Sequence, residues 1–428
     1  MKNHKFIARK TVPASVIVLL TSLYFAQGFP AGLLVQALPP ILRDAGVPVE
    51  YIGLLKLLAV PWVLKFLWAP FMDRFYSDRL GAHRGWILIM QFGLVAILVL
   101  LSFFSPYEMS TALIVVFLLL LFVMNTGCAT QDIATDGLAV KLLVPEQRGI
   151  GNSIQVSGYK LGMMLGGAAI LFGMDVVGWQ WTFLAMAGTM VLLTVSVYLF
   201  REAPQYGAPS NVSLASSTQT NSFLGLFVGA YKGFVSQPGI LLWLVVLLTY
   251  KVADSLASAM IKPLLIDLNY SLTEVGQITL ISSVTGLLGA IAGGYIYVIA
   301  GAKRCLIGLG ALQALSLGAY GLVETQNLNH IVVYIVACTE QMLDGMTTVA
   351  LFALMMDHCR KGSESTDYTV QACLQIVIAG VGAVSAGIGV KFLGYAPVFY
   401  SAAALGLIAL IPVWLLFRRY PKGSALIR

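Results

Sequence analysis

Nine ionisable side chains stand within the apolar stretches of this chain. They are Lys56, Lys65, Asp132, Asp136, Lys160, Lys251, Asp254, Glu340 and Asp344. A charged group in lipid is expensive, so such residues face a partner or a watery cavity and by default mark a functional site. Lysines and carboxylates of this kind can bind a polar solute of mixed charge. A buried carboxylate can also take up a proton on one side of a membrane and release it on the other.

The elements that position these side chains are predicted to be membrane helices. The chain has 428 residues, of which 58% are hydrophobic and only 11% are charged, whereas about a quarter are charged in soluble domains. A helix crosses the hydrocarbon with about 20 apolar residues. Twelve such stretches begin near Pro13, Ile52, Trp86, Thr111, Ile150, Trp181, Ile240, Val275, Cys305, Ile331, Thr369 and Val398. We therefore predict an all-α membrane protein with twelve transmembrane helices.

The basic residues set the expected topology. The net charge of +7 is typical of nucleic-acid binding as well as of membrane proteins, so the positions of the cations decide. With the N-terminus inside, most Lys and Arg fall in cytoplasmic tails and loops, and only Arg43, Lys262 and Lys391 fall in outer loops. This is the positive-inside pattern. We expect a multi-pass protein with both termini in the cytoplasm, and we exclude a nucleic-acid partner.

The sequence offers no arrangement for catalysis, a cofactor or a metal. All five cysteines lie in or at the ends of spans, which argues against a disulfide framework. Asp357, His358 and Cys359 are adjacent, and adjacent residues of a helix point in different directions, whereas metal sites use spaced ligands. A nucleotide-binding glycine loop is missing as well. We therefore expect no enzyme and no ATP hydrolysis, so any transport must draw on a gradient.

Span 4 carries two carboxylates four residues apart, so that both lie on one helix face. Asp136 falls in the cytoplasmic half of the span, where Arg74 or Arg79 could reach it, and we interpret it as part of a gate. Asp132 lies one turn deeper and is expected to face a cavity. Lys65 sits close to the cytoplasmic end of span 2, where a lysine can extend its ammonium to the interface.

Spans 1 and 5 combine glycines with polar side chains. Gly158, Gly162 and Gly166 are four residues apart, a spacing that lets a neighbouring helix approach closely. Lys160 lies about ten residues into span 5, near the midplane at 1.5 Å per residue. In span 1, Gln27 precedes Pro30, and a breaker in a membrane helix is tolerated where the freed backbone is buried or lines a cavity.

The second half of the chain also carries charged and polar residues within its apolar spans. Span 7 carries Tyr250, Lys251 and Asp254 at mid-depth, and the last two can pair at i, i+3. Span 10 carries Glu340 and Asp344, and span 11 adds Gln371. We interpret Glu340 as the proton site because it has no basic neighbour on its own helix. The alternative is that it pairs with Lys160 only to fix the packing of the two halves.

The charged span residues fall on spans 2, 4, 5, 7 and 10 and avoid spans 3, 6, 9 and 12. After span 2, the apolar stretch runs into a charged loop with Asp73, Arg74, Arg79 and Arg84. After span 8, Gly301, Lys303 and Arg304 repeat the pattern. These loops resemble the signature of the major facilitator superfamily. That resemblance implies two six-helix halves, 1–200 and 237–428, joined by a cytoplasmic linker and surface helix at 201–236. It also implies that the first loop gates one face.

Longer stretches resemble a narrower family. LYFAQGFPAGL, VLKFLWAPFMDRF, ATQDIATDG, VPEQRGIGNSIQVSGYKLGMMLGG and LLTYKVADSLASAMIKPLLIDL resemble the AmpG-like muropeptide permeases and their siderophore-permease relatives. LLVQALPPILRDAGVPVEYIGL looks more like the siderophore branch, and Lys160 stands where the muropeptide permeases carry an arginine after the tyrosine.

The resemblance implies a monomeric transporter of a bacterial inner membrane. We expect it to import a siderophore or similar small metal chelate by alternating access, coupled to protons. The alternatives are a muropeptide permease of cell-wall recycling and a non-transporting membrane sensor.

Overall fold

The computed structural model describes residues 12–47, 55–75, 80–108, 111–202, 223–326 and 329–420. The N-terminal elements are α2 (Ala14–Gly32), η1 (Leu33–Ala37), α3 (Leu38–Asp44), η2 (Leu55–Ala59), α5 (Val60–Leu64), η3 (Lys65–Leu67), α6 (Ala69–Arg74), α7 (Ala82–Leu101), η4 (Pro106–Glu108), α8 (Thr111–Leu142), η5 (Pro145–Gln147) and α9 (Arg148–Leu199). All of them are helical, as the composition predicts.

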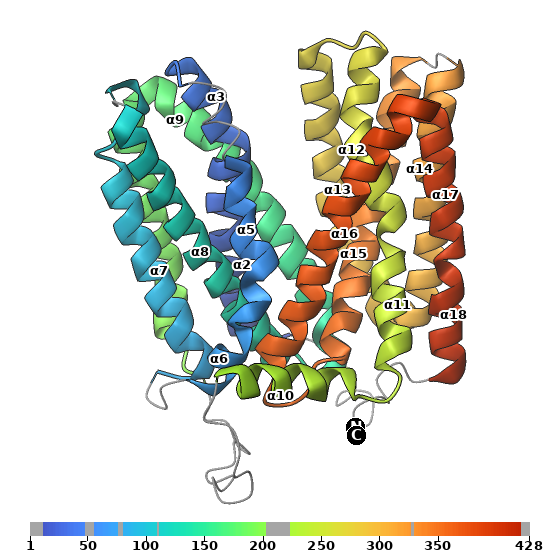
Figure 1. Cartoon of the computed structure of the whole chain (residues 1–428), viewed down its shortest axis with the longest axis horizontal. Coiled ribbons are helices and arrows are strands. Elements are labelled where there is room, and N and C mark those ends of the chain that lie inside the picture. The colour runs from blue at the N-terminus through green and yellow to red at the C-terminus, as the bar shows by residue number, and fades with distance from the viewer. Residues whose placement is uncertain are drawn as a thin grey trace, which may run out of the picture.

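The elements that follow the linker are α10 (Phe223–Val235), α11 (Ile240–Tyr250), α12 (Val252–Asp267), α13 (Leu272–Arg304), η6 (Cys305–Leu309), α14 (Gly310–Gln326), α15 (His330–Asp357), α16 (Glu364–Leu393), α17 (Tyr395–Ile408) and α18 (Leu410–Arg419). Figure 1 shows two upright bundles, one from α2 to α9 and one from α11 to α18, with α10 lying across one end of both. Most of the predicted linker, 203–222, lies outside the described residues.

Within the described ranges, eight helical segments are long and apolar enough to cross a membrane. Two of them, Pro145–Leu199 and Thr273–Gln326, have 55 and 54 residues, far more than the about 20 that one crossing needs. Each contains a glycine with positive φ, Gly178 at 75° and Gly301 at 79°. A left-handed residue breaks a helix and is easiest for glycine, so each segment consists of two helical limbs that meet at this glycine.

Span 1 is irregular where the sequence predicts it. α2 contains Pro30, which lacks a backbone donor for the preceding turn, and the five-residue π-helix η1 follows α2 directly. Span 2 is broken further into short helical pieces, with Pro61 and Pro70 at the starts of two of them. In lipid such backbone is tolerated only where it is buried or lines a cavity.

α2 and α9 pack at backbone distance through reciprocal glycines. A Cβ built on Gly28 would lie 2.1 Å from the carbonyl oxygen of Tyr159, and one built on Gly166 would lie 2.0 Å from that of Phe29. Gly32 and Gly162 make equally close approaches. The close helix contact expected from the glycine spacing of span 5 is therefore present, and its partner is span 1.

Candidate functional site

The two bundles meet at the end where α10 lies. Asp73, at the end of α6, accepts hydrogen bonds from the backbone N–H of Thr366 at 2.8 Å, from that of Ser365 at 3.2 Å and from the Thr366 hydroxyl at 2.6 Å. These donors belong to the first turn of α16, where N–H groups lack helical partners and favour an anion. Asp73 thus joins the N-terminal half to the C-terminal half.

A second group of contacts closes the same end. Arg148 at the start of α9 forms an ion pair with Asp357 at the end of α15, and the Ser153 hydroxyl donates to the carbonyl of Ala290 at 2.7 Å. The sequence reasoning did not single out the Arg148–Asp357 pair. It joins residues 209 positions apart, and neither lies in the loop after span 2.

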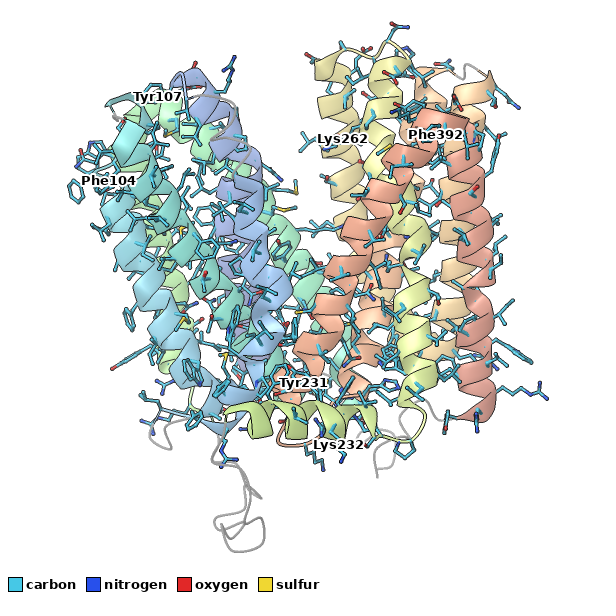
Figure 2. All side chains as sticks on the ribbon, viewed as in Figure 1. Phe104, Tyr107, Tyr231, Lys232, Lys262 and Phe392 are labelled. Atoms are coloured by element: carbon cyan, nitrogen blue, oxygen red, sulfur yellow. The ribbon has the colours of Figure 1, made fainter. Side chains whose placement is uncertain are left out.

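α10 touches both halves. The Tyr231 hydroxyl donates to the carbonyl of Phe66 in η3, and Arg360 donates to the carbonyl of Ala230 at 2.9 Å. Figure 2 shows Tyr231 pointing from α10 toward the bundles and Lys232 pointing away from them. This helix therefore spans the closed junction on its outer side.

Arg84 and Arg74 do not join the halves in this structure. The Arg84 guanidinium donates to the carbonyls of Val197 at 3.0 Å and Tyr198 at 2.7 Å, both in the last turn of α9 in the same half. Arg74 is exposed and has no ion pair within the described ranges, and Arg79 lies outside them. The expected contact between these arginines and Asp136 is therefore not found for Arg74.

Glu202 organises the start of α7. It accepts from the backbone N–H groups of His83 and Arg84, both at 3.0 Å, and pairs with Lys141 at 2.8 Å and His83 at 3.1 Å. Burial alone would raise the pKa of this carboxyl, but the donors from His83, Arg84 and Lys141 outweigh burial and lower its pKa to about 2. The carboxylate thus holds the ends of α7, α8 and α9 together.

This arrangement predicts an acid-dependent effect of Glu202→Gln. Because the folded pKa is below the ordinary 4.5, the stabilisation is fully present above about pH 4.5 and is lost as the pH falls toward 2. The variant should melt below wild type at pH 7, and the gap should narrow as the pH falls below about 4.5. Thermal unfolding of the detergent-solubilised protein measures this, with the exposed Glu146→Gln as control. A gap that does not change with pH would contradict the prediction.

A cavity of about 390 Å³ lies between the halves, within the range of roughly 300–1,000 Å³ common for small-molecule sites. Its lining comes from α2, α5, η3, α8, α9, α15 and α16. The lining residues are Tyr24, Gln27, Trp62, Lys65, Asp132, Asp136, Gln155, Val156, Tyr159, Lys160, Met163, Thr348, Phe352, Met355, Tyr368, Ala372, Gln375 and Ile376. Away from α10 the two bundles diverge (Figure 1).

Asp132 lines this cavity, as predicted, and forms a buried ion pair with Lys65. The interpretation of Lys65 as a lysine that extends to the interface is wrong: its side chain is 2% exposed, and its ammonium also lies 5.2 Å from the Trp62 ring centroid. The reason is that η3 breaks span 2 at Lys65 and the side chain is directed inward.

Asp136 lines the cavity as well, and among the described residues its partners are not the arginine expected from the sequence. It accepts hydrogen bonds from the Tyr24 hydroxyl at 3.0 Å and from the Gln155 amide at 3.2 Å. The Gln155 amide also reaches the hydroxyl of Tyr368 in the other half at 3.4 Å. Asp136 is thus held by neutral donors next to the closed end.

A charged cluster adjoins the cavity from the C-terminal half. Lys251 donates to Asp344 at 2.6 Å and lies 3.9 Å from Asp254, so the predicted i, i+3 pair forms but Asp344 is the closer partner. Lys160 lies 3.7 Å from Asp344. Of this cluster only Lys160 lines the cavity, so it connects the cavity to the carboxylates behind it.

Glu340 lies one turn before Asp344 on α15 and is 1% exposed. One carboxylate oxygen accepts from the Gln341 amide at 3.0 Å, and the other has no hydrogen-bond partner within the described residues. The alternative pairing of Glu340 with Lys160 is not formed, because Lys160 is directed to Asp344. Glu340 therefore remains the acidic group of this cluster with the fewest partners.

The structure brings two predicted residues to other places. The Tyr250 hydroxyl donates to the Leu306 carbonyl at 2.9 Å and borders a void of about 10 Å³ beside Asp254. Gln371 accepts from the Trp243 indole at 2.7 Å and donates to the Asp367 carbonyl at 2.9 Å. Neither lines the main cavity. The sequence indicates the depth of these residues in the membrane, but the direction of a side chain depends on the rotation of its helix in the bundle. Gln27, by contrast, lines it.

Several cavity residues were not found from the sequence. Tyr24, Trp62, Gln155, Tyr159 and Thr348 are neutral, so no charge in an apolar stretch marks them. The spacing of three and four residues from Tyr24 to Gln27 and Gly28, which places them on one helix face, was the available signal for span 1. In the part of the chain that is described, no group of three His, Cys, Asp or Glu side chains could hold a metal ion.

Two membrane-helix bundles that enclose a largely apolar cavity with a few charged and amide side chains, and that meet at one end, define a membrane transporter of solutes. The chain belongs to the Major Facilitator Superfamily, whose family model matches residues 20–375. This is a family of permeases and not of enzymes, so the transported solute, and not a reaction, is the open question.

The chain is similar to transporters of known name. It is 27% identical over 373 residues to the anhydromuropeptide permease of Escherichia coli strain K12, covering 85% of this chain and 72% of that protein. It is 24% identical over 393 residues to the putative transporter AmpG 4 of Rickettsia conorii, covering 90% and 92%. The solved human organic anion transporter MFSD10 superposes with a TM-score of 0.69 at 18% identity, covering 95% and 100%, which supports the fold alone.

Proposed function

We propose that the chain is a secondary transporter that imports an anhydromuropeptide across a bacterial inner membrane by alternating access. The observation that carries this proposal is the cavity between the halves, sealed beside α10 by Asp73 and by the Arg148–Asp357 pair. The names of the relatives favour the muropeptide prediction over the siderophore prediction.

The cavity chemistry suits this solute. An anhydromuropeptide combines sugar rings with a short peptide that bears amides and carboxylates. Tyr24, Trp62, Tyr159 and Phe352 offer aromatic surface, and such surface with a few placed polar groups is the usual make-up of a ligand site. Gln155, Gln375 and the lysines of the lining add donors for carbonyl and carboxylate oxygens.

The membrane arrangement is part of the proposal. If the two longest segments are each two spans, the eight segments become ten, and the short Leu57–Leu67 helix and α15 bring them to twelve. The distribution of Lys and Arg supports a cytoplasmic position for α10 and for both termini. The described state is then closed to the cytoplasm, with halves at 1–200 and 237–428 working as one monomer.

Proton coupling is assigned to the cluster behind the cavity. Lys160 and Lys251 face three carboxylates, Asp254, Glu340 and Asp344, so the cluster has one acid in excess. Buried charge without a partner is costly, and one proton makes the cluster neutral. Glu340, with one unpartnered oxygen, is the proposed carrier.

The test is uptake of labelled anhydromuropeptide by E. coli cells that lack their own anhydromuropeptide permease. Cells with the wild-type chain should accumulate the label, and a protonophore should abolish accumulation. Glu340→Gln should reduce accumulation at least about tenfold, since general proton-transfer roles are worth that much or more, while leaving membrane insertion intact.

Two controls separate the parts of the proposal. Lys391→Gln, which changes an exposed residue at the far end of α16, should transport as wild type does. Uptake that is indifferent to Glu340→Gln and to the protonophore would keep the solute and remove the proton site. Uptake of a ferric siderophore without uptake of muropeptide would return the assignment to the siderophore prediction.

A further inference from the structure

Lys160 has fewer hydrogen-bond partners than Lys65 and Lys251, the two other lysines described at this depth. Lys65 is hydrogen-bonded to Asp132, and Lys251 donates to Asp344 at 2.6 Å and to Thr347 at 3.3 Å. Lys160 donates no hydrogen bond to any described residue and only approaches Asp344, at 3.7 Å. An ammonium has three N–H donors, so all three are free to bind an acceptor.

The ammonium of Lys160 also lies in the wall of the cavity between the two halves. Its helix, α9, belongs to the N-terminal half, and its Nζ reaches α13 of the other half, where a Cβ on Gly286 would lie 3.0 Å from it. The side chain is 22% exposed, against 2% for Lys65 and 10% for Lys251. Lys160 is therefore the described cation of the cavity wall that a solute can most readily reach.

Asp344 does not depend on Lys160. One of its oxygens accepts from Lys251 at 2.6 Å and from the Thr348 hydroxyl at 3.2 Å, and only the other faces Lys160. Withdrawal of Lys160 leaves Asp344 paired with a buried lysine. Lys160 can therefore leave its long contact with Asp344 and bind another acceptor at shorter distance, and Asp344 is not left as an unpaired buried charge.

We propose that Lys160 binds a carboxylate of the transported solute and so selects anionic members of its class. The inference rests on the proposed function, because the peptide part of an anhydromuropeptide supplies that carboxylate. On binding, the ammonium leaves its long contact with Asp344 and forms charge-assisted hydrogen bonds of about 2.7–2.9 Å with the solute. The aromatic lining then meets the sugar rings while Lys160 holds the peptide end.

A purely structural role makes a different prediction. If Lys160 only holds the halves together through Asp344, its removal changes turnover for every solute by the same factor. If it binds a carboxylate, its removal changes KM for carboxylate-bearing solutes and leaves KM for their neutral forms nearly unaltered. The ratio of the two KM values therefore separates the roles.

The experiment measures uptake into proteoliposomes of labelled anhydromuropeptide and of the same molecule with its carboxylates converted to amides. Wild type should show a KM at least about tenfold lower for the free acid, since a hydrogen bond to a charged group is worth roughly 1.5–3 kcal/mol. In Lys160→Gln the two KM values should come within about threefold. Lys160→Arg, which keeps the charge, should keep most of the preference, and Lys391→Gln should keep all of it.

Each possible result supports or contradicts either the role of Lys160 or the proposed function. A wild-type ratio near one, or a ratio unchanged in Lys160→Gln, overturns the role of Lys160 while the proposed function stands. Failure of wild type to move either form overturns the proposed function and this inference with it. Should Lys160→Gln not give a monodisperse protein, the wild-type ratio and the retained preference of Lys160→Arg still decide.

Discussion

Gly166→Ala is expected to remove most of the folded protein from the membrane. A Cβ at Gly166 would lie 2.0 Å from the carbonyl oxygen and 2.8 Å from the carbonyl carbon of Phe29. Both are backbone atoms of α2, so no side-chain rotation can make room. The helices must separate, and the matching approach of Gly28 to Tyr159 is lost with them. Overpacking typically costs about 1–3 kcal/mol and occasionally more, and a clash with backbone atoms belongs to the upper end.

Size-exclusion chromatography and thermal unfolding of the solubilised protein measure this effect. Gly188→Ala is the matched control, because it lies on the second limb of α9, beyond Gly178, and a Cβ there meets no atom within 4 Å. Its yield should equal that of wild type. Equal yields and melting temperatures for both variants would show that α2 and α9 do not pack as described.

This packing was half predictable. The spacing of Gly158, Gly162 and Gly166 indicates a close neighbour, since glycines four apart share a helix face. It does not name the neighbour, because helices in a bundle choose partners by their shape along their whole length. The reciprocal Gly28 and Gly32 lie on either side of Pro30 in span 1, and nothing in their spacing alone pairs them with the glycines of span 5.

The cavity was predictable to a similar degree. Asp132 and Lys160 were correctly predicted to line the cavity. A charged residue within an apolar stretch is visible in the sequence, and its burial is too costly to occur without a partner or water. The hydrogen-bond partners of these residues were harder to predict from the sequence. Asp136 was assigned to Arg74 or Arg79, and the structure gives it Tyr24 and Gln155. Which side chain meets which across two halves depends on helix rotation and tilt, and local periodicity fixes neither.

The count of spans shows the same limit. Hydropathy separates spans where polar loops interrupt them, and the sequence predicts separate helices on either side of Gly178 and Gly301. In the structure, regular helix continues up to these glycines and resumes at once. A reversal at a single glycine adds almost no polar residues to the sequence. The boundary between the two helices is therefore visible only in the backbone conformation of that glycine.

The buried pair in the cavity wall gives the other large effect: Lys65→Met should destabilise the protein more than the double change Lys65→Met, Asp132→Asn. Removing the lysine alone leaves Asp132, 8% exposed, as a buried carboxylate without its cation, which costs about 3–5 kcal/mol. The double variant holds no such charge. Melting temperatures should therefore rank wild type above the double variant and the double variant above Lys65→Met.

Transport assays of the same variants show whether the Lys65–Asp132 pair serves stability or function. The double variant should fold yet accumulate little anhydromuropeptide, because the charges that line the cavity beside Trp62 are gone. Lys232→Met, at a lysine on α10 that points away from the bundles (Figure 2), controls for the loss of one lysine. If Lys65→Met and the double variant melt together, Asp132 is not left unpaired by the loss of Lys65, and its charge must be met by another donor of the cavity. If the double variant transports normally, the pair serves the packing of span 2 against α8, and recognition falls to Lys160 and the aromatic lining.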